Sequence, residues 1–200
     1  MDAVLIVLGG YLLGSAPFGY WVVRLFRGED IRTKGSGNIG ATNVWRVYGR
    51  RLGVPVILLD VAKGFVPALV GLKVSGELVG VLAGAAAMAG HWRPLYLRFA
   101  RGGKTVATAG GVALALAPLA AACCVVIWLV IFLVGRYSSV ASIATGLALP
   151  VLIWVFGGDW PVITFGVLAA LAILVLHKGN MRRLLDGTES RFHFRRAARA

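Results

Sequence analysis

Three segments of this sequence combine glycine with polar and basic side chains, a composition that suits the binding of phosphate groups. The first, GSGNIGATN, covers residues 35–43 and is followed by Arg46. Glycines let the backbone turn several N–H groups toward one anion, and hydroxyl and guanidinium groups add further donors. The alternative is a flexible loop whose arginine rests on lipid headgroups. The predicted ligand-binding residues of this segment are Ser36, Gly37, Asn38, Asn43 and Arg46.

The second segment, GGKTVAT, covers residues 102–108 and opens a long apolar stretch. It is not a Walker A motif, because that motif needs a glycine five positions before Gly103 and position 98 is Arg98. Two glycines and a lysine at a helix start still combine backbone donors, helix dipole and charge. A lysine that reaches from the membrane to water is the alternative. We take Gly102, Gly103 and Lys104 as candidate binding residues.

The third segment begins with His177 and reads HKGNMRRLL. His177 and Asn180 are three residues apart and would share one helical face. The imidazole could act as a general base, donate to a phosphate or simply lie at the membrane surface, and His91 is a competing histidine. Ser139 and Ser142 could present hydroxyls to the same region. The candidate catalytic residues are His177, Asn180 and Ser142.

The elements that position these segments must be membrane helices. The chain of 200 residues is 58% hydrophobic and only 14% charged, with a mean hydropathy of +0.81. Soluble domains are about a quarter charged, so residues 1–200 are predicted to form one multi-span membrane domain. Cys123 and Cys124 are adjacent in an apolar run and cannot build a disulfide framework.

The basic residues predict the topology. Lys and Arg outnumber Asp and Glu by 21 to 8 and cluster within residues 24–51, 93–104 and 178–199, which we place in the cytoplasm. The stretch 105–135 would be roughly 46 Å long as one helix, against a membrane core of about 30 Å, so we expect a break at Pro118. The prediction is an all-α protein with about seven transmembrane helices, the N-terminus outside and the C-terminus cytoplasmic. Its cytoplasmic parts are the loops 28–50, 91–105 and 136–142 and the tail 178–200.

Small and charged residues inside the spans predict how the helices pack. The glycine pairs of residues 10–14 and 80–84 have the four-residue spacing that lets membrane helices approach closely. Asp60 and Lys63 would be costly in contact with lipid, so we expect them to pair inside the bundle. Residues 41–48 should form a short interfacial helix, and Val44, Trp45 and Tyr48 are expected to face lipid.

The residue inventory excludes several kinds of chemistry. There is no Cys/His metal cluster, too few carboxylates for a two-metal phosphotransferase, and no G-x-S-x-G elbow. No metal, cofactor or nucleic acid is therefore expected. Composition, charge and motifs therefore predict a membrane protein with a phosphate-type site on its cytoplasmic side. They do not identify its reaction.

Three motifs carry a resemblance to a known family. SGNIGATN from Ser36, GGKTVAT from Gly102 and HKGNMRRLLDGTE from His177 are similar to the three motifs of the bacterial acyl-phosphate:glycerol-3-phosphate acyltransferases. GSAPFGY, LDVAKG, GHWRP and RYSSVASI are similar as well, so the likeness runs from residue 14 to residue 189 in order and spacing. The chain departs from the family at Thr105, where glycine is usual, and at Met181, where isoleucine is usual.

The resemblance implies an activity and a location. Such enzymes transfer a fatty acyl group from acyl phosphate to the 1-hydroxyl of glycerol 3-phosphate, giving lysophosphatidic acid and phosphate, at the start of phospholipid synthesis. The implied location is the inner membrane of a bacterium. The implied partners are the two substrates and the lipid bilayer, with room for an interaction with the enzyme that makes acyl phosphate.

The resemblance also assigns roles. Ser36, Gly37 and Asn38 would bind the donor phosphate, and Arg46 and Lys104 would hold glycerol 3-phosphate with help from Ser142. His177 and Asn180 would orient the acceptor hydroxyl and the carbonyl. Either His177 or the departing phosphate can take the proton.

A small transporter of phosphate-type anions or phosphorylated metabolites is the alternative function. It would place its site at the membrane midplane, between inverted repeats with broken helices. This sequence has no evident repeat, and its polar residues gather on one side of the predicted membrane.

Overall fold

The computed structural model describes residues 2–192, and every regular element in that part of the chain is a helix. Met1 and residues 193–200, the end of the predicted cytoplasmic tail, lie outside the described residues. Two single-turn 3-10 helices cover Ile31–Thr33 and Leu95–Leu97. The α-helices are α1 (Asp2–Gly14), α2 (Phe18–Arg27), α3 (Ala41–Tyr48), α4 (Arg50–Ser75), α5 (Glu77–Trp92), α6 (Val106–Leu116), α7 (Pro118–Gly135), α8 (Ser138–Val155), α9 (Trp160–Leu176) and α10 (Lys178–Leu185).

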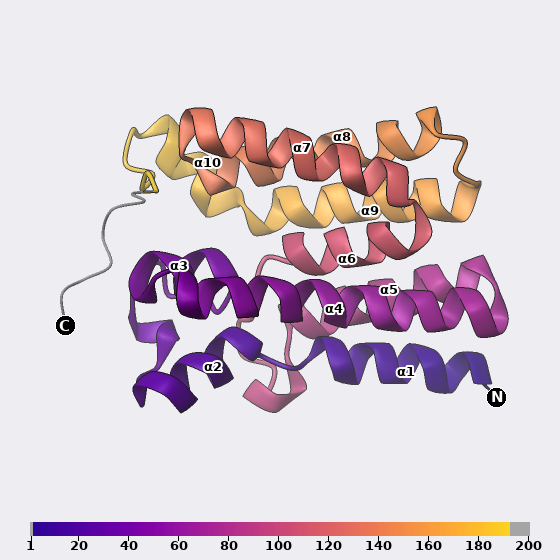
Figure 1. Cartoon of the computed structure of the whole chain (residues 1–200), viewed down its shortest axis with the longest axis horizontal. Coiled ribbons are helices and arrows are strands. Elements are labelled where there is room, and N and C mark those ends of the chain that lie inside the picture. The colour runs from indigo at the N-terminus through magenta and orange to yellow at the C-terminus, as the bar shows by residue number, and fades with distance from the viewer. Residues whose placement is uncertain (1, 193–200) are drawn as a thin grey trace.

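The apolar helices α1 and α4 to α9 lie side by side along the long axis of the molecule (Figure 1). The expected break in stretch 105–135 is present, because α6 ends at Leu116 and α7 begins at Pro118. By length and composition, four helical segments can cross a membrane, or five if the bent pair α9 and α10 is counted as one span. The all-helical prediction is confirmed, while the number seven stays a prediction.

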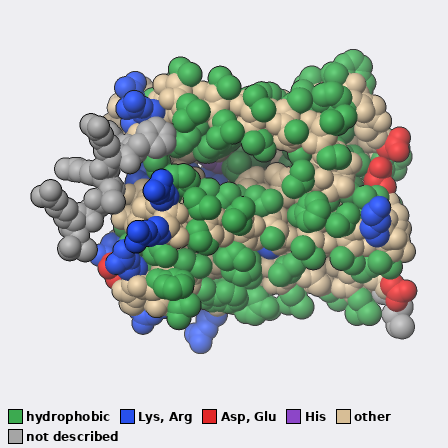
Figure 2. All heavy atoms as spheres, viewed as in Figure 1, with side chains coloured by type: hydrophobic (Ala, Val, Ile, Leu, Met, Phe, Trp, Pro, Cys, Tyr) green, Lys and Arg blue, Asp and Glu red, His purple; other side chains and the backbone are tan. Residues whose placement is uncertain are grey.

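The surface is divided along the same axis. Hydrophobic side chains cover most of its length, and most Lys and Arg gather at the end where α2, α3 and α10 lie (Figure 2). Acidic side chains are visible at both ends, several of them at the end opposite the basic residues. An apolar belt with basic residues concentrated on one side is the distribution that the positive-inside rule describes.

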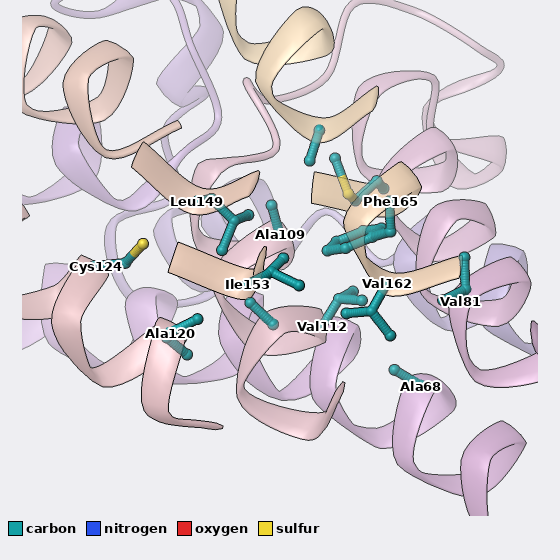
Figure 3. Packing of buried hydrophobic residues seen from close by; sticks show 14 residues of the cluster. Ala68, Val81, Ala109, Val112, Ala120, Cys124, Leu149, Ile153, Val162 and Phe165 are labelled. Carbon is teal, nitrogen blue, oxygen red and sulfur yellow. The ribbon is translucent and has the colours of Figure 1, made fainter. Parts of the chain in front are cut away.

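The core is built from small and branched side chains. Those of Ala68, Val112, Ile153, Val162 and Phe165, from four different helices, converge in the cluster of Figure 3. The expected close approach of helices is confirmed where α1 meets α5: a Cβ added at Gly14 would overlap the backbone of Ala87. Backbone contact of this kind is a main source of stability for helices in lipid.

The first apolar stretch contains a break that its hydrophobicity does not reveal. α1 ends at Gly14 and α2 begins at Phe18, since Pro17 between them has no N–H for a continuous helix. The carbonyl of Ala16, which accepts from the Phe18 N–H at 3.0 Å, also accepts a hydrogen bond from Lys63 Nζ at 2.9 Å. Lys63 Nζ also lies 2.7 Å from Asp60 Oδ1, and both side chains are almost fully buried. The expected Asp60–Lys63 pair is thus confirmed, and it stabilises the break between α1 and α2.

The short helix predicted at residues 41–48 is present as α3, but the expected orientation of Val44 is wrong. Val44 is fully buried and packs with Val23 of α2 and Val56 of α4. The apolar side of α3 that was predicted to contact lipid therefore packs against the protein instead. This packing turns Asn43 and Arg46 inward and fixes the loop that precedes α3.

Candidate functional site

The first glycine-rich loop is held in shape by Asn43. Its Oδ1 accepts a hydrogen bond from the N–H of Ser36 at 2.9 Å, and its Nδ2 donates to the carbonyls of Lys34 and Asn38 at 3.1 and 2.8 Å. Asn43 is only 3% exposed. Gly37 has φ +69°, a conformation that glycine adopts without strain. Asn43 therefore shapes the loop that presents Ser36 and Gly37 and has little surface left for a ligand.

The second loop is fixed against the end of α5. The N–H groups of Gly102 and Gly103 donate to the carbonyls of Trp92 and His91 at 2.9 and 3.0 Å. Gly103 lies directly against the buried ring of His91, and an added Cβ would overlap that ring. Thr105 has φ +62°, which explains why glycine is the usual residue there in the family that the motifs resemble. The loop is thereby turned so that Lys104 faces the first loop.

The two loops meet around a cavity of about 130 Å³. Asn38 Nδ2 donates to the carbonyl of Gly102 at 3.3 Å and so joins the loops directly. No Asp or Glu is among the described residues that line the cavity. The residues that line it are Ser36, Gly37, Asn38, Arg101, Gly102, Lys104, Gly179, Asn180 and Arg183.

The third segment closes the cavity from the other half of the bundle. α10 is inclined by 55° to α9, so that Asn180 at its start is turned toward the loops. Lys104 Nζ donates to Asn180 Oδ1, and Asn180 Nδ2 donates to Glu189 Oε1 at 2.6 Å. Asn180 is thus a bridge between the lysine and a carboxylate, with one amide hydrogen left over.

Glu189 is the acceptor at the centre of this network. Besides Asn180, it accepts from Ser139 Oγ at 2.7 Å and from Arg183 Nε at 2.8 Å. Burial raises the pKa of Glu189, but the hydrogen bonds from Ser139, Asn180 and Arg183 outweigh burial, and the net pKa lies below its usual range. The carboxylate is therefore ionised at neutral pH and can orient the cations around it.

The segment that carries Glu189 is anchored by an aromatic cluster. Phe192 is 2% exposed, and its ring lies 5.3 Å from that of Phe132 and 5.9 Å from that of Trp45. The Phe192 N–H also donates to the carbonyl of Arg136 at 2.8 Å. These contacts fix residues 186–192 against α3, α7 and the start of α8, which holds Glu189 beside Asn180.

The cations around the cavity lack matching negative charge. Burial, followed by the nearby arginines, lowers the pKa of Lys104 to about 8 despite Glu189. Burial likewise lowers the pKa of Arg46, whose Nε is buried and has no hydrogen-bond partner among residues 2–192. Buried cationic donors without partners are costly unless an anion joins them. The electrostatics therefore favour a bound phosphate group.

His177 and Ser142 are not among the residues that line the cavity. His177 Nδ1 is 2.8 Å from the carbonyl of Ile173, so in the neutral ring Nδ1 carries the hydrogen and Nε2 is the acceptor. Ser142 Oγ accepts from the indole N–H of Trp128 at 3.1 Å, which leaves its hydroxyl hydrogen for another acceptor. Both side chains are nearly buried, at 3% and 6% exposed.

The structure brings the three predicted segments together, although not all of the predicted residues line the cavity. Six of the predicted residues line the cavity: Ser36, Gly37, Asn38, Gly102, Lys104 and Asn180. Asn43 and Gly103 support the loops from behind, and Arg46, Ser142 and His177 lie outside the lining. Arg101, Arg183 and Glu189 were not predicted from the sequence. The one signal for Glu189 was its place at the end of the third motif.

Comparison with known proteins gives concordant results along the whole chain. A family model described as glycerol-3-phosphate acyltransferase matches residues 4–187. A glycerol-3-phosphate acyltransferase of Desulforudis audaxviator is 44% identical and aligns with 97% of this chain and 98% of its own. One from Aquifex aeolicus is 42% identical over 96% of this chain and all of its own.

Solved structures agree with the family model and the curated relatives. The chain is similar to a crystal structure of PlsY, an integral membrane glycerol 3-phosphate acyltransferase, in its glycerol 3-phosphate form. The TM-score is 0.93 and the identity 41%, over 96% of each chain. The lysophosphatidic acid form of PlsY gives a TM-score of 0.90 at 39% identity, over 97% of each chain.

Proposed function

The chain belongs to the glycerol-3-phosphate acyltransferase family, and we propose that it takes its acyl group from acyl phosphate. It is a membrane acyltransferase that acylates glycerol 3-phosphate in phospholipid synthesis. One observation carries the proposal for the donor. Two glycine-rich loops with cationic neighbours meet at one cavity that no carboxylate lines, an arrangement suited to two substrates that each bear a phosphate.

The loops divide between the two substrates in this proposal. Ser36, Gly37 and Asn38 bind the phosphate of the donor, because Asn43 holds their backbone in a phosphate-binding shape. Lys104 and Arg46 bind the phosphate of glycerol 3-phosphate, since both are buried cations whose charge is not fully balanced. Ser142 adds a hydroxyl on the same side, with its orientation set by Trp128.

The reaction follows from these positions. The 1-hydroxyl oxygen of glycerol 3-phosphate attacks the acyl carbonyl carbon, a new ester C–O bond forms, and the bond from the acyl carbon to phosphate oxygen breaks. Because acyl phosphate is a mixed anhydride with a good leaving group, the step needs no covalent enzyme intermediate. Orientation alone can supply roughly 7–11 kcal/mol. The residues around the cavity act mainly by holding two anions in contact.

His177 orients the attacking hydroxyl in this mechanism. Its Nε2 is the acceptor in the tautomer set by Ile173, and the departing phosphate takes the proton. Asn180 accepts a hydrogen bond from Lys104, and the remaining amide hydrogen of Asn180 points toward the carbonyl oxygen of the acyl group.

The donor is tested by supplying the purified, membrane-reconstituted protein with radiolabelled glycerol 3-phosphate and one donor at a time. Acyl phosphate should give labelled lysophosphatidic acid and one equivalent of phosphate. Acyl-CoA and acyl carrier protein should give none. If acyl-CoA supports the reaction and acyl phosphate does not, the proposed donor is wrong while the family assignment stands.

Replacing His177 should separate orientation from base catalysis. His177→Gln keeps a hydrogen-bonding group that cannot titrate, so it should retain more activity than His177→Ala and keep the acidic limb of the wild-type pH–rate profile. A true general base contributes roughly 10²–10⁴-fold. Steady-state rates between about pH 5 and about pH 9 for both variants provide the measurement. Equal loss in both variants, with the acidic limb abolished, would make His177 the base.

The affinity for glycerol 3-phosphate should fall as the pH rises through about 8. Lys104 has a lowered pKa of about 8, so its positive charge is present below that pH and is lost above it. The KM for glycerol 3-phosphate should therefore rise above about pH 8. In Lys104→Arg the KM should not rise in this way, because a guanidinium stays charged throughout the pH range of the assay. An identical alkaline limb in Lys104→Arg would assign the limb to another group.

The membrane arrangement is part of the proposal. We infer that residues 1–200 form one domain that crosses a bacterial inner membrane seven times, with α1 and α4 to α9 as the spans. The loops 28–50, 91–105 and 136–142 and the tail from residue 178 then share the cytoplasm with the cavity. A contact with the enzyme that makes acyl phosphate would occur on this side.

Cysteine accessibility tests the topology. Single cysteines at Lys34, Arg101 and Arg183 should react with an impermeant thiol reagent only from the cytoplasmic side, and cysteines at Ser75 and Gly158 only from outside. The measurement is labelling of intact cells against inverted vesicles, in a chain whose Cys123 and Cys124 are replaced by serine. Labelling at position 183 from outside alone would exclude seven spans.

A further inference from the structure

A second, larger cavity lies where α2 ends and α4 begins. Its volume is about 540 Å³, and it shares no lining residue with the cavity between the glycine-rich loops. Arg27 comes from the end of α2, while Arg50 and Arg51 form the first turn of α4. The residues that line it are Phe26, Arg27, Tyr48, Gly49, Arg50, Arg51 and Leu52.

The described residues offer the arginines of this cavity no direct ion pair. Within residues 2–192, no salt bridge or side-chain hydrogen bond involves Arg27, Arg50 or Arg51. Glu29, which interacts with Arg27 at longer range, already binds Lys34 Nζ at 2.9 Å and accepts from the Tyr48 hydroxyl at 3.2 Å. Three guanidinium groups around one hollow repel one another unless an anion lies between them.

The same cavity has an apolar wall that continues into the lipid-facing surface. Phe26 is 65% exposed, and its neighbour Leu25 is 78% exposed. α2 follows the proposed span α1 and α4 forms the next span, so the cavity lies toward the basic end of the molecule, where α2 and α3 are found (Figure 2). A free anion would gain nothing from the apolar wall, whereas an amphiphile matches both parts.

We propose that the arginine cavity binds the headgroup of an anionic diacyl phospholipid of the bilayer. The three arginines contact the phosphate and the acyl chains lie along Phe26 and Leu52. Basic pockets between membrane helices on the cytoplasmic side recognise lipid headgroups in this way. Because no residue of this site belongs to the proposed reaction, the inference stands apart from the identity of the acyl donor.

The proposal is tested by electron paramagnetic resonance of spin-labelled lipids around the protein in phosphatidylcholine bilayers. The wild-type protein should associate with spin-labelled phosphatidylglycerol several times more strongly than with spin-labelled phosphatidylcholine. Each basic residue near the surface is worth roughly fivefold in such binding. Because two such residues are removed, Arg50→Gln/Arg51→Gln should abolish the preference and bring the relative association constant to a value near one.

A matched variant controls for general surface charge. Arg98→Gln/Arg182→Gln removes the same charge from exposed positions outside the cavity and should keep the wild-type preference for phosphatidylglycerol. Acyl transfer in pure phosphatidylcholine should be equal in all three proteins, which confirms that they are folded. Equal loss of preference in both double variants, or no preference in the wild type, would overturn the proposal.

Discussion

Lys104→Ala should lower kcat/KM for glycerol 3-phosphate by at least roughly thirtyfold while leaving membrane insertion intact. Lys104 donates to Asn180 within a network that is already positively charged, so its ammonium serves the ligand more than the fold. Removing one partner of a buried charge pair costs about 2–5 kcal/mol, and about 1.4 kcal/mol is a tenfold change. Steady-state kinetics with glycerol 3-phosphate varied at saturating donor provide the measurement.

Two variants complete this experiment. Lys104→Arg should recover only part of the activity, because a planar guanidinium cannot reproduce the contact of a compact ammonium with Asn180. Lys178→Ala removes an exposed lysine beside the same network and should change kcat/KM little. Wild-type kinetics in Lys104→Ala would show that this lysine does not bind substrate.

Gly103→Ala should reduce activity by roughly a hundredfold without unfolding the protein. A Cβ at Gly103 would overlap the ring of His91, which is 3% exposed and cannot move aside. The loop must then shift, and a displacement of about 1 Å at a positioned group can cost roughly 10²-fold in rate. The measurement combines steady-state kinetics with thermal unfolding in detergent.

Two glycines of α6, just after this segment, serve as controls. A Cβ at Gly110 meets nothing within 4 Å, so Gly110→Ala should preserve activity and stabilise α6 slightly. A Cβ at Gly111 would overlap the carbonyl of Val61, so Gly111→Ala should lower the unfolding temperature by disturbing the packing of α6 on α4. If Gly103→Ala behaves like Gly110→Ala, the contact with His91 does not position the loop.

Local chemistry made much of the fold predictable. The break at Pro118 follows from the missing N–H of proline and the limited thickness of a bilayer, and the pairing of Asp60 with Lys63 follows from the cost of charge in lipid. The burial of Val44 was not predictable in this way. A hydrophobic helix face has the same sequence pattern whether lipid or protein covers it. Whether Val44 is buried depends on where α2 and α4 lie in the folded chain.

The site was predictable to the extent that its residues lie in contiguous motifs. Six of the eleven predicted residues line the cavity, because each motif places a loop or a helix start at the same end of the bundle. Glu189 escaped prediction because its function depends on Ser139, fifty residues away, and on the anchoring of Phe192. Asn43 looked like a ligand-binding residue, and its actual contacts within the first loop emerge only from the folded chain.

The most direct test of the account is to map the phosphate site chemically. Pyridoxal 5′-phosphate carries a phosphate and an aldehyde that forms an imine with an unprotonated amine, which borohydride then reduces to a stable adduct. At about pH 8, Lys104 should be modified ahead of the exposed Lys34 and Lys178, since its pKa is lowered to about 8 and the cations around the cavity attract the phosphate. Peptide mapping should show that glycerol 3-phosphate protects Lys104 and preserves activity in proportion. Modification of Lys104 that is unaffected by glycerol 3-phosphate, or inactivation with Lys104 unmodified, would contradict the site proposed here.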